Sequence, residues 1–188
     1  MCIRDRAYAF DVACEIDPQR KGVTLTISNG GEVGVALNVY AAGGQAGPWS
    51  FTVEPSKSIR HEVLAGVEAY DLSIHGPNGF FRHFRGGIEA MREPEVRFES
   101  GSASIALEGQ MTLSRYGYVP ADHEVTVTAG MPRVGLKAEA WTVPLSASGN
   151  WYDFEVTSST DPTFLRRYAG HIETGAPSIS DPLIGQRP

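Results

Sequence analysis

Short runs of alternating apolar and polar residues recur along the chain, and turn-forming residues separate them. The run VTLTIS (23–28) alternates Val, Leu and Ile with Thr and Ser, and Asn29 with two glycines then ends it. VGVALNVY (33–40) returns with the same period. A two-residue period predicts β-strands with one buried face, and no segment shows a sustained helical period. The pattern therefore predicts an all-β fold.

The pattern predicts seven strands in the first half of the chain and seven more in the second, where the alternation is looser. These predicted strands cover residues 7–15, 22–28, 33–41, 49–54, 58–64, 69–75, 80–85, 95–99, 103–108, 111–116, 123–128, 134–141, 151–157 and 163–168. Strands of this length and spacing are typical of immunoglobulin-like (Ig-like) sandwiches. We therefore expect two tandem small β-sandwich domains, each large enough for a single two-sheet core.

The segment GGIEAMREP (86–94) forms the natural boundary between the two expected domains. The first domain then covers residues 7–90, and the second covers 91–188 with a C-terminal tail. The first six residues, MCIRDR, have no apolar period and resemble translated adapter sequence. We interpret residues 1–6 as a non-native leader, with the natural chain continuing upstream.

One hairpin motif occurs twice, as YDLSIHGPNGFFRHFRGG (70–87) and WYDFEVTSSTDPTFLRRYAGH (151–171). Both copies begin with Tyr-Asp and end with aromatic residues, arginines and a glycine. In the first copy, the loop 77–79 (Pro-Asn-Gly) fits a type I turn closed by a left-handed glycine. This turn sets a register in which Ile74 lies opposite Arg82.

The register divides the first hairpin into two faces. One face should pack in the core, and it carries Tyr70, Leu72, Ile74, Phe80 and Phe84. The other carries Asp71, Ser73, His75, Phe81, His83 and Arg85.

Arg82 falls on the apolar face near the turn, and Arg166 is its match in the second copy. One interpretation is that both pin the hairpin to the sandwich edge, with their stems on aromatic rings and their guanidinium groups toward solvent or a carboxylate. The other is contact with a ligand such as phosphate. Tyr70 and Tyr152 are expected to anchor the core with their hydroxyls bonded to backbone. The candidate binding residues are Phe81, Arg82, Arg85, Trp151, Arg166 and Arg167.

The net charge of the chain argues against one class of binding partner, the nucleic acids. The 188 residues carry a formal net charge of −6, and neither half of the chain is basic. Nucleic-acid binding is therefore not expected, because phosphate contacts need clustered Lys and Arg. No apolar run approaches the roughly 20 residues of a membrane-spanning helix. Cys2 and Cys14 are too few for a disulfide framework, and Cys14 is expected to be a small apolar strand residue.

Motifs of catalysis are missing from this sequence. It contains no G-x-S-x-G, Walker loop, H-E-x-x-H or dinucleotide-binding fingerprint. His75 and His83 could meet near Asp71 as a weak metal site, although solvated strand histidines are the simpler interpretation. The three tryptophans could form a platform for sugar or choline, with core or edge packing as the alternative. We predict no catalytic residue, metal or cofactor in this chain.

The two hairpins and the tail ETGAPSISDP (173–182) resemble the tandem C-terminal repeats of bacterial phosphocholine-preferring phospholipases C, of hemolytic and non-hemolytic type. The resemblance covers about residues 7–184, and YDLS followed by GPNGF is its most specific part. It implies a secreted or periplasmic parent enzyme that cleaves phosphatidylcholine or sphingomyelin with a phosphatase-like catalytic domain. No catalytic residue of that domain has a counterpart here.

The resemblance implies an accessory role for the chain, docking to the catalytic domain of the parent chain or to a zwitterionic phospholipid membrane. A rival interpretation is a free-standing β-sandwich module that binds carbohydrate or protein. A third, an enzyme in its own right, has no motif to support it.

Overall fold

The structure is a computed structural model that describes residues 8–44, 46–89, 93–99, 101–108, 111–115, 118, 126–129, 138–175 and 177–182. Within these residues the chain forms fourteen strands and two three-residue 3-10 helices, η1 (Ala42–Gly44) and η2 (Ser146–Ser148). The predicted all-β fold is confirmed. No helix in the described part of the chain is long and apolar enough to cross a membrane.

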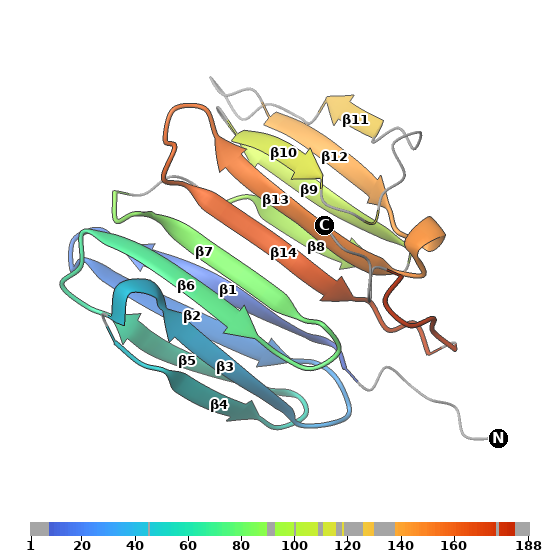
Figure 1. Cartoon of the computed structure of the whole chain (residues 1–188), viewed down its shortest axis with the longest axis horizontal. Helices are drawn as coiled ribbons and strands as arrows, with labels where there is room; N and C mark the ends of the chain where they lie inside the picture. Colours follow the sequence, from blue (N-terminus) through green and yellow to red (C-terminus); the bar gives the residue numbers. More distant parts are fainter. Residues whose placement is uncertain are drawn as a thin grey trace.

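The strands pair into three antiparallel sheets (Figure 1). The three-stranded sheet has the order β1 (Phe10–Asp17), β2 (Gly22–Asn29), β5 (Lys57–Leu64). The four-stranded sheet has the order β11 (Thr126–Ala129), β12 (Ala138–Pro144), β9 (Ser102–Glu108), β8 (Glu95–Glu99). The seven-stranded sheet has the order β10 (Met111–Arg115), β13 (Trp151–Ser158), β14 (Leu165–His171), β7 (Phe81–Gly87), β6 (Ala69–His75), β3 (Val35–Ala41), β4 (Trp49–Val53).

The seven-stranded sheet joins the two repeats, because β7 of the first pairs with β14 of the second. Residues directly opposite on paired strands share a face. Leu72, Phe84, Arg166 and Val156 follow one another across four strands in this way, and all four are buried. The three- and four-stranded sheets lie on that side of the long sheet (Figure 1). Two sandwiches therefore share one continuous layer.

The first hairpin has the predicted register. Ile74 lies opposite Arg82, and the amide of Gly76 donates to the carbonyl of Phe80 at 2.9 Å. Gly79 has φ = 71°, and a Cβ at this position would approach the Trp151 ring to 2.8 Å. The turn therefore requires glycine for its backbone and also for the packing of the second repeat against it.

One interpretation of the sequence placed the hairpin at the edge of a sandwich, and the structure contradicts this. β6 and β7 stand in the interior of the seven-stranded sheet, between β3 and β14. Local alternation gives the two faces of a hairpin, but it does not reveal which strand pairs with the far side of β7.

The two repeats differ in one strand. β4 pairs with β3 in the shared sheet, whereas β11 pairs with β12 in the four-stranded sheet. The predicted strands 123–128 and 134–141 lie partly outside the described residues, as does the leader 1–6. The domain boundary near residue 90 stays a prediction.

Candidate functional site

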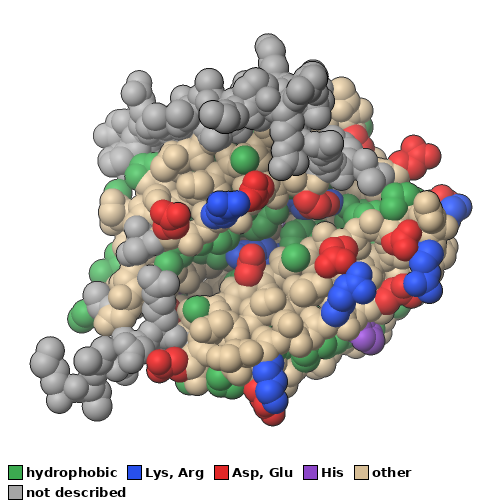
Figure 2. All heavy atoms as spheres, turned by 180° about the vertical axis from the view of Figure 1, so that it is seen from behind, with side chains coloured by type: hydrophobic (Ala, Val, Ile, Leu, Met, Phe, Trp, Pro, Cys, Tyr) green, Lys and Arg blue, Asp and Glu red, His purple; other side chains and the backbone are tan. Residues whose placement is uncertain are grey.

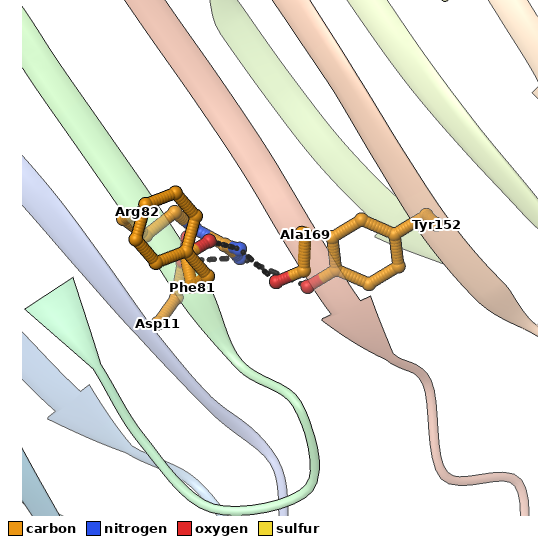
Figure 3. A network of polar contacts seen from close by, with 5 residues as sticks. All are labelled: Asp11, Phe81, Arg82, Tyr152 and Ala169. Atoms are coloured by element: carbon orange, nitrogen blue, oxygen red, sulfur yellow. Dashed lines mark hydrogen bonds and ion pairs between the residues drawn. The ribbon is translucent and has the colours of Figure 1, made fainter. Parts of the chain in front are cut away.

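The Arg82 guanidinium is buried between the two repeats, with 1% of the residue exposed. Its Nε and Nη2 donate to Oδ1 of Asp11 at 3.3 and 3.0 Å. Nη1 donates to the carbonyls of Phe81 and Ala169 at 3.0 and 3.1 Å, and Nη2 also donates to the Tyr152 hydroxyl at 3.1 Å. Figure 3 shows these groups converging from strands of both repeats. All five donor hydrogens thus have an acceptor.

Arg166 repeats this arrangement and is also 1% exposed. Its Nε donates to Glu93 at 2.6 Å, and its Nη1 donates to the carbonyls of Arg85 and Leu165, both at 2.8 Å. Nη2 donates to the Tyr70 hydroxyl and to the second carboxylate oxygen of Glu93. The second guanidinium is therefore fully bonded as well.

The two clusters exchange tyrosines between the repeats. Arg82, on β7, bonds Tyr152 on β13, and Arg166, on β14, bonds Tyr70 on β6. Each guanidinium also lies over a phenylalanine ring of its own hairpin, at 4.1 Å for Phe80 and 4.4 Å for Phe164. The expectation that the tyrosine hydroxyls bond to backbone was wrong, because their partners are these arginines.

The sequence analysis allowed a carboxylate partner for each arginine but did not identify Asp11 or Glu93. Asp11 lies six residues before the end of β1, and Glu93 lies six residues before the end of β8. A carboxylate at the same distance from the end of the first strand of each repeat was the available signal. A phosphate contact by Arg82 or Arg166 would have to displace these carboxylates or another present acceptor.

The other candidate binding residues lie elsewhere. Phe81, Arg85 and Arg167 are half-buried on the face of the long sheet that points away from the two outer sheets. Arg167 bonds both oxygens of Asp153 and lies 5.5 Å over the Phe81 ring. Trp151 is buried, and its Nε1 donates to the carbonyl of Ile179 at 3.1 Å.

His75, His83 and Asp71, the residues of the possible weak metal site, do not converge on one point. His83 Nε2 lies 2.7 Å from Asp71, and the rings of His75 and Phe81 are 4.9 Å apart. Among the described residues, no group of three or more His, Cys, Asp or Glu side chains is placed to hold a metal ion.

A pocket of about 370 Å³ opens beside the Arg82 cluster. Phe10 and Phe80 line it from the first repeat, and Val96, Phe98 and Tyr152 line it from the second. Seen from behind the long sheet, the molecule is hollowed between its two lobes, with hydrophobic side chains deep in the hollow (Figure 2). Residues of both repeats thus line one pocket.

Burial also changes the acidity of groups beside Arg166. Desolvation raises the pKa of the Cys14 thiol to about 12, although the positive charge of Arg166 opposes this shift. Burial likewise raises the pKa of Tyr70 to about 12, again against Arg166. Both groups therefore stay protonated in the folded chain well above the pH at which they ionise when unfolded.

Removing either exchanged hydroxyl should destabilise the chain. In Tyr152→Phe or Tyr70→Phe, one buried guanidinium N–H loses its acceptor, and we expect the free energy of unfolding to fall by about 1.5–3 kcal/mol. Urea denaturation measures this change. Tyr40→Phe is the matched control. Tyr40 is 46% exposed, so this substitution should leave the free energy of unfolding unchanged. Wild-type stability in both buried variants would contradict the assigned bonding.

Stability should decline at alkaline pH. The unfolded chain loses the Cys14 proton near pH 9 and the Tyr70 proton near pH 10, while the folded chain keeps both until about pH 12. Stability is therefore intact below pH 9 and falls above it, by about 1.4 kcal/mol per pH unit for each group. Urea midpoints at pH 8, 9.5 and 10.5 test this. Cys14→Ala should show a shallower decline, and an unchanged slope would contradict the assignment.

The comparisons with known proteins agree on one family. The model for "Bacterial phospholipase C, C-terminal domain" matches twice, over residues 10–87 and 102–171. Non-hemolytic phospholipase C of Burkholderia pseudomallei is 37% identical over 193 residues, which span 94% of this chain and 27% of that protein.

Two proteins of Pseudomonas aeruginosa are also similar. Its hemolytic phospholipase C is 38% identical over a match that spans 65% of this chain and 18% of that protein. Its non-hemolytic phospholipase C is 33% identical over a match that spans 87% of this chain and 25% of that protein. The chain thus spans about a quarter or less of the length of these relatives. With two matches that cover both repeats, the chain belongs to the family of bacterial phospholipase C C-terminal domains.

Proposed function

We propose that the chain is the non-catalytic accessory region of a secreted or periplasmic phospholipase C acting on phosphatidylcholine or sphingomyelin, and that it docks on the catalytic domain of its parent chain. Its relatives are three or more times longer than the part it matches. A region of this kind has a large neighbour in the same polypeptide. The observation that carries the proposal is the free face of the long sheet.

No other strand in the described part of the chain covers that face, which crosses both repeats. Over the second repeat, Tyr118 and the tail residue Ile179 pack on Trp151, so the open part lies mainly over the first repeat. A row of rings runs over it, with 5.6 Å between Tyr40 and His75, 4.9 Å between His75 and Phe81, and 6.2 Å between Phe81 and His83. The Arg167 guanidinium continues the row into the second repeat. Aromatic and arginine side chains are enriched in protein interfaces.

Protein docking fits this surface better than insertion into lipid. Insertion needs clustered exposed apolar side chains. The exposed large hydrophobic residues of the described part are Val33, Tyr40 and Ile179, which belong to three separate segments. The free face instead mixes rings with charged pairs such as Arg167–Asp153.

Phe81→Ser should weaken docking without unfolding the chain, because Phe81 is only half-buried and points away from the core. We expect at least a tenfold, or roughly 1.4 kcal/mol, loss of affinity. The measurement is calorimetric titration of this chain with the separately expressed catalytic domain of its parent. His61→Ser is the control, since His61 is exposed on β5 of the three-stranded sheet.

The absence of any complex with the catalytic domain would contradict the docking role. Co-sedimentation with phosphatidylcholine and sphingomyelin vesicles at physiological salt provides the other arm. Pelleting that Phe81→Ser abolishes would assign the free face to lipid instead.

A further inference from the structure

The pocket between the repeats lies apart from the free face of the long sheet. Its lining includes Arg82 and Tyr152, which lie on the side of that sheet where the outer sheets pack. Its volume of about 370 Å³ lies in the range of small-molecule sites. The docking role makes no use of it.

Aromatic rings form much of its wall. Phe10 packs on Phe80 with 4.5 Å between ring centroids, and Phe98 packs on Tyr152 with 4.4 Å. Tyr8 adds its ring edge against Phe10 at 6.3 Å. Rings of both repeats thus face one space, and aromatic faces attract positive charge. The Arg82 guanidinium, 4.1 Å over Phe80, already uses this attraction.

Two carboxylates complete the lining. Asp11 bonds Arg82 through Oδ1, none of the described residues donates to its Oδ2, and the side chain is 56% exposed. Glu173 also lines the pocket, where it accepts hydrogen bonds from the Tyr8 amide at 2.9 Å and from Asn78 at 3.1 Å. The basic residues of the described lining are Arg82, whose five hydrogens are taken, and His171, whose ring nitrogens lie against Asn78 and the Gly149 carbonyl. An anionic ligand would find no free donor on Arg82 and would meet two carboxylates.

From these observations we propose that the pocket binds a small organic cation of the substituted-ammonium type. The positive charge lies against Oδ2 of Asp11, and the alkyl groups lie against Phe10 and Phe98. The same chemistry occurs in free ammonium compounds and in lipid headgroups. This site is independent of the proposed docking role, because Phe81 and the free face take no part in it.

Tetramethylammonium is the probe, and tert-butyl alcohol is its neutral match in size. Each is titrated into the full chain at constant ionic strength, and binding is followed by NMR shifts of the pocket rings. We expect saturable one-to-one binding of the cation, with a dissociation constant on the order of millimolar. The neutral match should bind at least roughly fivefold more weakly. Equal binding of both, or no saturation by the cation, overturns the proposal.

Variants locate the charge. Asp11→Asn should weaken cation binding by roughly fivefold or more, and Glu173→Gln, which keeps an acceptor for the Tyr8 amide, by roughly threefold. Glu62→Gln removes an equal charge from the exposed surface of β5 and should change nothing. If Asp11→Asn fails to fold, Glu173→Gln carries the test. Unchanged affinity in every folded pocket variant overturns the assigned site.

A vesicle arm identifies the source of the ammonium group. Pelleting with phosphatidylcholine vesicles that Glu173→Gln reduces and Phe81→Ser leaves intact supports a lipid headgroup. Binding of tetramethylammonium without pelleting supports a free ligand. The pattern also separates this site from the docking role, since Phe81→Ser should not change the affinity for tetramethylammonium.

Discussion

Two positive charges buried between the repeats constrain the rest of this structure. An unpaired guanidinium in a protein interior is strongly unfavourable, so Arg82 and Arg166 each require a full set of acceptors. Neither repeat supplies that set by itself. Arg82 takes the Ala169 carbonyl and the Tyr152 hydroxyl from the second repeat, and Arg166 takes its counterparts from the first. The pairing of β7 with β14 is what brings these acceptors within reach.

The joined sheet also explains the two surfaces of the molecule. Both outer sheets pack on one side of it, and none of the described strands covers its other side. On the packed side, each sandwich has its own outer sheet, and the space between them leaves the aromatic pocket. The pairing of β7 with β14 therefore produces both the broad face for which we propose a protein neighbour and the pocket for which we propose a small ligand.

Local structure could be predicted closely from the sequence. The alternation around VTLTIS gave β2, and the Pro77-Asn78-Gly79 turn gave the register that places Ile74 opposite Arg82. These features depend on residues near one another in the chain.

Long-range features could not be predicted in this way. The partners of Arg82 lie 71 and 87 residues away in Asp11 and Ala169. No periodicity indicates such pairs. The switch of β11 to the outer sheet was missed for the same reason, because a strand pattern does not name its neighbour. The paired Tyr-Asp and Arg motifs of the two hairpins were visible, but their exchange between repeats follows only from the β7–β14 pairing.

Because each buried arginine takes acceptors from both repeats, the two repeats should unfold as one cooperative unit, and a two-probe unfolding experiment tests this most directly. Trp49 lies on β4 of the first repeat and Trp151 on β13 of the second. Variants that retain one of them as the single tryptophan report the two halves separately by fluorescence during urea denaturation. The account predicts coincident transitions with the same midpoint. Two separate midpoints, with one repeat still folded after the other has melted, would contradict it.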